Sequence, residues 1–542
     1  MRSAPWLALV ALAAGCLPRG PAPAGEHVLA TRAVSGVQLL PGVGGAPARL
    51  LVWQERADLD GADLSVSTLA EGHAGPFKLL AERIDSEQSM CRGSLACSYL
   101  VDGRGRIYLR RSSGPRETRD GRPTPMLRID PSGAVEDLGP VDFLFAVSPS
   151  GDRAVLPDRD LSDRIHLEEP GRSTDIDGVR WWSFVGEDLF LVTGMVPSRV
   201  DVSPQPTRLS VRRADGTISV VEERVDNVTV HEVGGKTRLV LYRRLYDGNA
   251  QHSLLDPATL VETRLGEPIQ GGQVTFSSDG RYAAINSWSS SEGQRMRKVM
   301  FVDLTTGAQE GHTVMATMGP SGALAWRPGH AEAWISSGLE TVVWRPGAAL
   351  VSLGELDLHI PVRNGSNEGS PFTPDGAFYF SAEFNDYFQV NGFIPVRLVS
   401  ADDPRSAGLV LNPAGSAMND LRDLPDGRLL IAAWTTLPQR GDLYLIDPRQ
   451  GTRKPVASGG NVITTGHTRA LAMLRWLEKA NAGDLTVLDL ASGAHLDLAE
   501  NVRSWSVDVT RADPLAPGAP IAYFVRSPLP SPFDGLWLAA VP

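Results

Sequence analysis

The chain has 542 residues, of which 42% are hydrophobic and 21% are charged, the composition of a folded protein rather than a disordered one. Its formal net charge of −11 at pH 7 argues against a nucleic-acid partner, because binding to phosphates needs a basic face. The 55 Gly and 40 Pro predict many turns.

The first predicted element is an export signal. Arg2 precedes an apolar run over residues 5–15 that is too short to span a bilayer as a mature helix. The run ends in Ala-Ala-Gly before Cys16, which resembles a bacterial lipoprotein signal peptide over residues 1–15. The resemblance implies that Cys16 carries a lipid, and residues 16–27 read as a Pro/Ala/Gly tether. A plain secretory signal, cleaved near Ala14 or Ala24, remains open.

The lipoprotein pattern has consequences for location and partners. Leu17, rather than Asp, follows the cysteine, which in Gram-negative lipoproteins is compatible with sorting to the outer membrane. We therefore expect a protein held at the membrane by its N-terminal lipid, on the periplasmic face or at the cell surface. An envelope protein or a peptidoglycan-associated partner would then be within its reach.

Two short motifs follow the tether. Asp58, Asp60 and Asp63 in "DLDGAD" place oxygen atoms at alternating positions, a weak calcium candidate that lacks the EF-hand spacing and its terminal Glu. Cys91 and Cys97 are the remaining cysteines, and in an exported protein they predict one small-loop disulfide. Two thiolates without a nearby His or a second Cys pair do not complete a zinc site.

A hairpin unit recurs along the rest of the chain. Each copy is a short strand, a tight polar turn with Asp or Gly, and a second apolar strand. The clearest copies lie at 146–156, 274–288, 371–384 and 421–434, with looser ones at 99–111 and 326–337. A strand followed by a Gly-ending turn, such as "LYLIDPRQG", recurs after these hairpins at a period of roughly 47 residues, as in propeller blades.

The hairpins resemble the repeats of TolB-like propellers, a WD-repeat-like periplasmic family whose blades carry an "SPDG" turn. "FSSDGRYAAINSW" and "FTPDGAFYFSAEF" carry the likeness. It implies an all-β propeller of four-stranded antiparallel blades across residues 28–268 and 269–542. About eleven units predict either two tandem rings or one ring of seven to eight long blades. Residues 27–40 are expected to supply an outer strand to the C-terminal segment 534–542, which closes the ring.

Two segments have competing interpretations. Residues 468–483 have helix-forming composition, but their place in the repeat favours a strand. Trp181 and Trp182 are adjacent in a predicted strand, so their rings must face opposite sides of the sheet. Most other Trp residues are expected to fill the space between blades rather than to form a ligand platform.

The sequence carries no strong catalytic signature. No G-x-S-x-G elbow or H-E-x-x-H motif occurs, and the ten His are scattered. Asp279, Asp375 and Asp426 lie in Asp-Gly turns and are interpreted as turn formers. The sequence therefore favours a non-enzymatic binding scaffold, with no cofactor, no metal and no catalytic residue assigned. A propeller lyase or hydrolase with its site at the central channel, or a carbohydrate-binding surface protein, remains as an alternative.

Overall fold

A computed structural model describes the protein as an all-β molecule, and its described residues contain no helix. The described residues are 22–42, 47–56, 61–84, 99–102, 104–111, 125–140, 146–157, 163–194, 207–245, 248–270, 272–291, 294–316, 324–336, 340–354, 356, 358, 370–382, 395–412, 416–436, 440–477, 482–508, 511–528 and 530–541.

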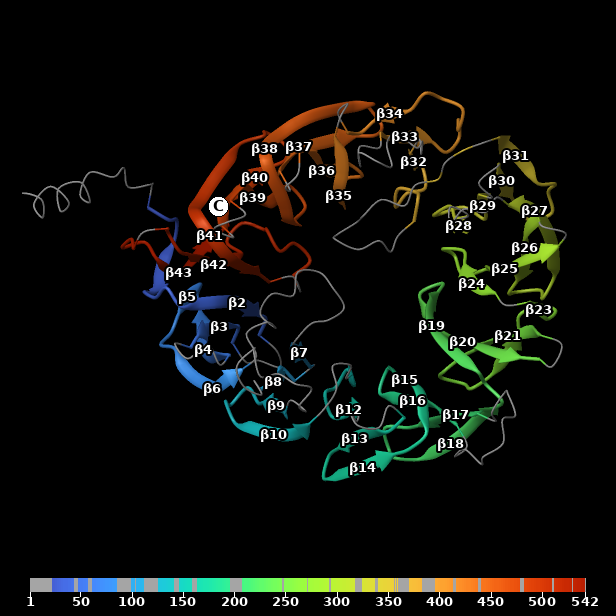
Figure 1. The fold of residues 1–542 in the computed structure, drawn as a ribbon, viewed down its shortest axis with the longest axis horizontal. Helices are drawn as coiled ribbons and strands as arrows, with labels where there is room; N and C mark the ends of the chain where they lie inside the picture. The colour runs from blue at the N-terminus through green and yellow to red at the C-terminus, as the bar shows by residue number, and fades with distance from the viewer. Residues whose placement is uncertain are drawn as a thin grey trace, which may run out of the picture.

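Consecutive strands pair antiparallel into small sheets, the blades, which follow one another around a ring (Figure 1). Blade one has β2 (Val34–Leu40), β3 (Arg49–Glu55), β4 (Ala62–Ala70), β5 (His73–Ala74) and β6 (Lys78–Ile84). Blade two has β7 (Tyr99–Val101), β8 (Ile107–Arg110), β9 (Pro125–Ile129) and β10 (Val135–Pro140). Blade three has β11 (Ala146–Val147), β12 (Ala154–Pro157), β13 (Ile165–Glu169) and β14 (Arg172–Ile176). Blade four has β15 (Val179–Val185), β16 (Asp188–Gly194), β17 (Thr207–Arg212) and β18 (Ile218–Glu223).

The next four blades continue the same meander. Blade five has β19 (Asn227–Val233), β20 (Lys236–Arg244), β21 (Asn249–Leu255), β22 (Glu262–Arg264) and β23 (Ile269–Gln270). Blade six has β24 (Gln273–Phe276), β25 (Tyr282–Ser291), β26 (Gln294–Asp303) and β27 (Gln309–Ala316). Blade seven has β28 (Leu324–Trp326), β29 (Ala333–Ser336), β30 (Thr341–Trp344) and β31 (Val351–Gly354). Blade eight has β32 (Phe378–Ala382), β33 (Val396–Ser400) and β34 (Leu409–Val410).

The last three blades form one ten-stranded sheet. Its strands are β35 (Ala417–Asp423), β36 (Leu429–Thr436), β37 (Arg440–Asp447), β38 (Thr452–Thr465), β39 (Arg469–Leu477), β40 (Ala482–Asp489), β41 (His495–Val507), β42 (Pro520–Val525), β43 (Gly535–Ala540) and β1 (Glu26–Leu29). β38 is the outer strand of blade nine and the inner strand of blade ten, and β41 links blades ten and eleven in the same way. The segment 469–477, with its helix-forming composition, is strand β39, as its place in the repeat predicts.

The Asp-Gly turns form as the sequence predicts. The Asp279 carboxylate accepts hydrogen bonds from the Ser277 hydroxyl (2.6 Å) and the Arg281 amide (3.0 Å), and Gly280 has a φ of 69°. Asp375 accepts the same pair of bonds from Thr373 and Ala377. These carboxylates stabilise turns, which accounts for Asp at these positions without a catalytic role.

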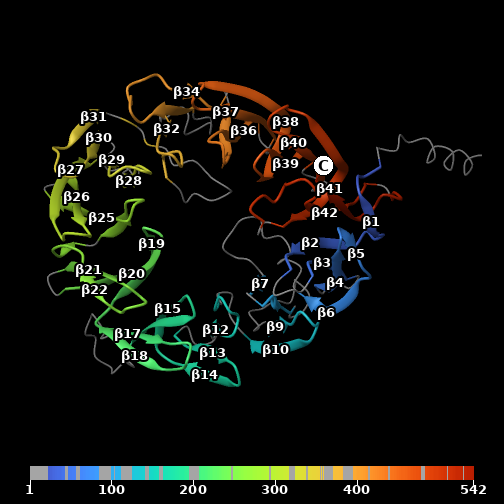
Figure 2. The ribbon, with the colours of Figure 1, turned by 180° about the vertical axis from the view of Figure 1, so that it is seen from behind.

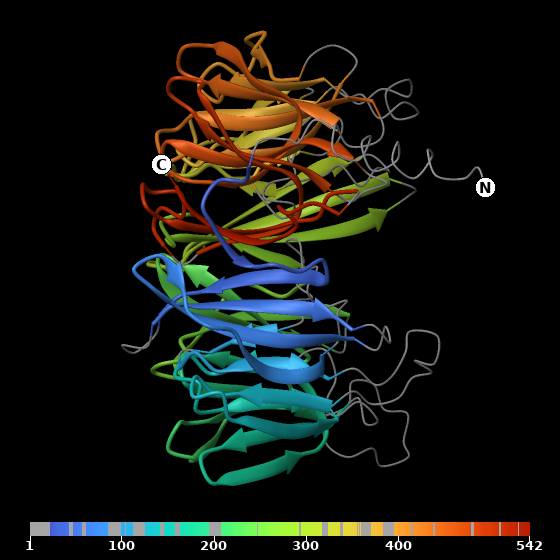
Figure 3. The same ribbon diagram turned by 90° about the vertical axis from the view of Figure 1, so that its left-hand side faces the viewer.

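The antiparallel meander gives the ring two different faces. Connections between the first and second strands of a blade, and between its third and fourth strands, lie on one face, which we call the turn face. Second-to-third connections and the passages from blade to blade start from the opposite face, which we call the loop face. Figure 2 shows the ring from behind and Figure 3 shows it from the side, with the strands running between the two faces.

Hydrophobic packing between neighbouring blades closes one ring. The buried apolar residues of the described chain fall into eleven clusters, and each cluster joins one pair of consecutive blades. One cluster joins blades five and six across the predicted boundary at 268/269, and another joins blade eleven to blade one. A chain of eleven blades with eleven interfaces is a single closed ring.

The blade number therefore corrects the sequence-based estimate. The all-β propeller with four-stranded antiparallel blades is confirmed, but the described residues form one ring of eleven blades rather than two tandem rings or one ring of seven to eight long blades. The repeat count of about eleven was right. The prediction divided these repeats between two rings, or merged some of them, because common rings hold four to eight blades. Ring size, however, depends on the angle between neighbouring blades, which the repeat pattern does not encode.

The two ends of the described chain meet in blade eleven, as the sequence predicts, but only the first part of the predicted outer strand over 27–40 pairs there, because β2 is instead the inner strand of blade one. Strand β1 pairs with β43, with His27 opposite Trp537 and their rings stacked at 4.5 Å. The Tyr523 hydroxyl donates to the Ala24 carbonyl, and the Ala24 amide donates to Leu498 (2.7 Å). An N-terminal strand thus covers what would be a free sheet edge.

Tryptophan side chains fill the spaces between blades, as expected. Trp53, Trp334 and Trp344 are almost fully buried within these clusters. Trp181 packs toward blade five and Trp182 toward blade three, so the adjacent rings face opposite sides of their strand.

Candidate functional site

The site residues expected from the sequence lie mostly outside the described residues. These are Cys16, Cys91, Cys97, Asp58 and Asp60. Their lipidation, disulfide and calcium assignments therefore stay predictions.

Asp63, the described member of the calcium candidate, is engaged by the protein itself. Its Oδ1 atom pairs with Arg56 at 2.8 Å and accepts the Arg83 amide at 3.3 Å. Within the described ranges, no three His, Cys, Asp or Glu side chains are placed to hold a metal ion. No helix long and apolar enough to cross a bilayer was found in this part of the chain.

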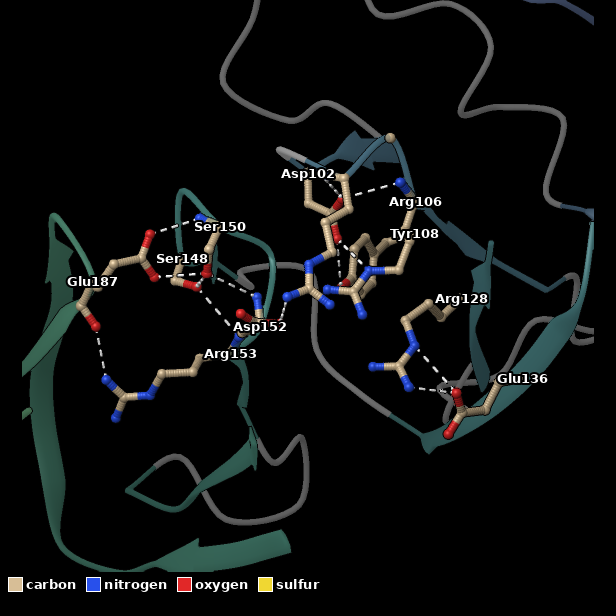
Figure 4. A network of polar contacts seen from close by, with 12 residues as sticks. Asp102, Arg106, Tyr108, Arg128, Glu136, Ser148, Ser150, Asp152, Arg153 and Glu187 are labelled. Atoms are coloured by element: carbon tan, nitrogen blue, oxygen red, sulfur yellow. Dashed lines mark hydrogen bonds and ion pairs between the residues drawn. The ribbon is translucent and has the colours of Figure 1, made fainter. Parts of the chain in front are cut away.

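A polar network crosses the turn face from blade two to blade four (Figure 4). Asp102 accepts hydrogen bonds from the backbone amides of Arg104 and Arg106, and from the Arg106 Nε atom at 2.7 Å and the Tyr108 hydroxyl at 3.2 Å. Burial raises the pKa of Tyr108 to about 12, so its hydroxyl stays protonated and acts as a donor. Arg104 forms an ion pair with Asp152 of blade three.

The same network continues into blade four. The Glu187 carboxylate accepts bonds from the amide (2.6 Å) and hydroxyl (2.8 Å) of Ser150, and its backbone carbonyl accepts one from Arg153 (2.8 Å). Arg153 and Arg212, both 3% exposed at the side chain, share the Glu169 carboxylate. Because charges of opposite sign pair across blade boundaries, the network connects the turns of neighbouring blades, and we interpret it as structural rather than reactive.

A serine, a histidine and an aspartate meet on the outer hairpin of blade three. Ser173 Oγ lies 2.7 Å from His166 Nε2, and His166 Nδ1 lies 2.6 Å from Asp175 Oδ1. This geometry matches a nucleophile, base and orienting acid. However, Glu168 also lies 2.7 Å from Nε2. Partial burial lowers the pKa of His166, but hydrogen bonds to Asp175 and Glu168 outweigh it and raise the pKa. With one carboxylate at each ring nitrogen, both nitrogens favour a bound proton and neither is free to accept one from Ser173, so we interpret the group as a surface ion cluster.

A second charged group lies at the loop face of blade ten. Arg475, at the end of β39, forms an ion pair with Asp484 of β40 and lies 3.8 Å from Glu500 of β41. Burial raises the pKa of Asp484, and Glu500 raises it further, against the lowering effect of Arg475. In the described residues, every other carboxyl group with a resolved shift has a lowered pKa. A carboxyl group shifted this way is a functional-site candidate.

The backbone around Asp484 is also unusual. Arg475 and Asn501 have positive φ values, 47° and 58°, which non-glycine residues seldom adopt. Asn501 is the bend at which β41 passes from blade ten to blade eleven. Its amide donates to Asp484, and its carbonyl accepts the Arg526 amide at 3.1 Å. The backbone of one residue, Asn501, thus connects Asp484 to Arg526 of blade eleven.

Three arginines gather next to Asn501, and we call Arg32, Arg503 and Arg526 the arginine group. Burial lowers the pKa of Arg503, and so do Arg526 and Arg32, while Glu55 and Asp534 raise it. Among the described residues, the Nε atom of Arg503 is buried without a hydrogen-bond partner. The arginine group and the set Arg475, Asp484, Glu500 and Asn501 together form what we call the loop-face cluster.

Blade nine provides an internal comparison for this cluster. Its strands have the same register and bulges, so Asp442 corresponds to Asp484, and Trp434, Ser458 and Gly459 correspond to Arg475, Glu500 and Asn501. Blade ten therefore keeps the aspartate of the repeat and adds charged neighbours where blade nine has none. The cluster was not predicted from the motifs, but the alignment of these two repeats contains a signal for it, because charged residues replace uncharged ones beside the shared aspartate.

Comparisons with known proteins give distant likenesses to solved structures. No known protein family matches the chain, and no curated protein matches it. Solved structures with some likeness include the β-propeller domain of the Trilobed protease from Pyrococcus furiosus, at 10% identity and TM-score 0.29, covering 59% of this chain and 97% of that one. Another is Porphyromonas gingivalis dipeptidyl peptidase 4, at 12% identity and TM-score 0.35, covering 91% and 65%. A third is an oligogalacturonate lyase in complex with manganese, at 14% identity and TM-score 0.28, covering 66% and 86%.

These likenesses are distant. The chain spans about half, 52%, of the acylaminoacyl peptidase chains that it also matches. What defines the class of this protein is its own ring of antiparallel blades, which is that of a β-propeller.

Proposed function

We propose that the protein is a non-enzymatic cell-envelope lipoprotein whose propeller binds a ligand or protein partner at its loop face. The observation that supports this proposal is the grouping of like charges at the loop face. On the turn face, ions of opposite charge pair across blade boundaries. In the loop-face cluster, three arginines act on one another and Glu500 acts on Asp484, whose pKa is raised, so a bound molecule of complementary charge would offset their repulsion.

Site-specific photo-cross-linking in the full-length protein tests where the partner binds. A photoreactive residue replaces Arg475 on the loop face or Arg449 on the turn face, both of which are strongly exposed. We expect a discrete adduct from position 475 and none from position 449. Adducts only from position 449 would place the partner on the turn face and contradict the proposal.

Membrane anchoring is tested separately through Cys16. We expect Cys16→Ser to move the protein from the membrane fraction to the soluble fraction, because the lipid attaches to that thiol. Unchanged fractionation would reject the anchor and leave the loop-face site unaffected.

An enzyme is the second candidate, and the raised pKa of Asp484 beside Glu500 favours it. Acid–base catalysis uses a carboxyl group whose pKa is moved toward the working pH. A large thermal stabilisation by one divalent ion, or turnover of a glycan that Asp484→Asn abolishes, would support an enzyme over a scaffold. Binding of a glycan without turnover would instead support a carbohydrate-binding protein.

A further inference from the structure

We infer that the arginine group of blades eleven and one is a subsite for a carboxylate carried by the bound ligand. This inference rests on the proposed binding function and specifies the chemistry of its ligand. It depends on three observations: the arginines lie together at the loop face, the acid Asp534 already bonds to other groups, and the charged groups around Arg503 have a net positive charge.

All three arginines lie at the loop face. Arg32 precedes β2, the inner strand of blade one, and Arg503 lies where β41 becomes the inner strand of blade eleven. Arg526 directly follows β42. All three are half-buried, and Arg503 lies within electrostatic range of the other two. Like charges are brought together in this way at a cost, which a bound anion offsets.

The nearest acid is already engaged. Asp534 accepts hydrogen bonds from the amides of Ser527 (2.7 Å) and Ser531 (3.1 Å), and it pairs with Arg32 at 3.2 Å. Arg32 also donates to the Ser527 carbonyl at 2.8 Å. Asp534 thus holds Arg32 in place, and among the described residues no acidic side chain pairs with Arg503 or Arg526.

The net positive charge of the groups around Arg503 favours a ligand with a single negative charge. The groups that act on Arg503 are two further arginines, Asp534 and the exposed Glu55, so three positive charges face two negative ones. A planar carboxylate matches the guanidinium fork and carries a single charge. Asp484 and Glu500 lie on the other side of Asn501 and disfavour a multiply charged phosphate by repulsion. The same two groups can accept hydrogen bonds from hydroxyl or amide groups next to the ligand carboxylate.

Two sources of such a carboxylate are a sugar acid and a peptide C-terminus. Calorimetry with the full-length protein at low ionic strength separates them. The probes are glucuronate and N-acetylalanine, each paired with its neutral counterpart, glucose and N-acetylalaninamide, and inorganic phosphate is the third anion. We expect one of the carboxylates to bind, while its neutral counterpart and phosphate bind at least tenfold more weakly.

Variants assign the binding to the subsite. Arg503→Gln and, as an independent variant, Arg526→Gln are expected to weaken binding at least tenfold. Arg449→Gln on the turn face removes the same charge from an exposed site and is expected to change nothing. Circular dichroism verifies folding of each variant.

Three outcomes would overturn the inference: no carboxylate binding, phosphate binding as tight as carboxylate, or equal loss in all variants. If a cross-link at position 475 persists in Arg503→Gln while no carboxylate binds, the carboxylate subsite fails and the loop-face binding function stands.

Discussion

At the scale of single residues, the structure separates aspartates that support turns from one that does not. Asp279 and Asp375 receive their hydrogen bonds from within their own turns, so their role follows from the local sequence. Asp484 lies in the same kind of repeat as Asp442, yet its surroundings come from β39 and β41. Local sequence could predict the first two roles. The third depends on neighbours from two other strands, which the local sequence does not reveal and which an alignment of the two repeats indicates.

Asp484→Asn gives a pH test of the buried carboxyl group. Because the pKa of Asp484 is raised above its ordinary 3.8, the folded protein holds this proton more tightly than the unfolded chain does. Stability from this group is therefore present at low pH and is lost as the pH rises through the window above 3.8. We expect the free energy of unfolding of the wild type, relative to Asp484→Asn, to fall between about pH 4 and pH 7. Urea titrations at both pH values measure it.

Asp442→Asn is the matched control for this experiment. It changes the corresponding carboxyl group of blade nine, which lacks the charged neighbours of Asp484. A pH-dependent difference of the same size and sign in Asp442→Asn would show that the effect belongs to the repeat and not to the cluster.

At the scale of elements, the tight hairpin turns also join neighbouring blades. The turn between β28 and β29 meets the turn before β32, where Arg327 Nε donates to the Gly376 carbonyl at 2.7 Å. A Cβ atom on Gly376 would come 2.3 Å from the Pro328 carbonyl oxygen. The Asp-Gly pair in the sequence predicts the turn. The pair does not predict that the glycine also provides room for the neighbouring blade seven, because that contact is between residues distant in the sequence.

Gly376→Ala and Gly427→Ala form a matched pair at this scale. Both glycines have positive φ and follow Asp in a hairpin turn, but the nearest atom to a Cβ on Gly427 is 3.8 Å away. We expect Gly427→Ala to cost about 1 kcal/mol from backbone strain. Gly376→Ala should cost about 3 kcal/mol, because the clash with blade seven adds to that strain. Chemical denaturation measures both, and equal costs would contradict an inter-blade contact at Gly376.

At the scale of the whole molecule, ring closure depends on residues separated by nearly the full length of the chain. The repeat pattern predicted that both ends contribute to one blade, and strands β1 and β43 confirm it. The same pattern did not determine how many blades share the ring, because closure is set by the packing angles of eleven interfaces. Bulky side chains such as Trp53 and Trp334 lie in these interfaces, and the repeat pattern alone does not show how they pack.

Tyr523→Phe tests the closure directly. It removes the hydroxyl that donates to Ala24, so we expect a loss of about 1 kcal/mol in the free energy of unfolding and faster amide exchange in β1 and β43. Tyr379→Phe is the control, because its hydroxyl bonds to Pro404 at 3.1 Å within blade eight. A similar loss of stability is expected there without faster exchange in β1. Unchanged exchange in Tyr523→Phe would show that this bond does not contribute to closure.

The two long strands β38 and β41 have a mechanical consequence for the molecule. Most blade boundaries in the described chain are held by side chains, but blades nine to eleven belong to one continuous sheet of hydrogen-bonded strands that ends in β1. A pulling force applied at the N-terminus therefore acts across this sheet first. Backbone hydrogen bonds within one sheet share such a force, so blades nine to eleven resist it together. The other blade boundaries, which are held by side-chain packing, are where the ring is expected to open.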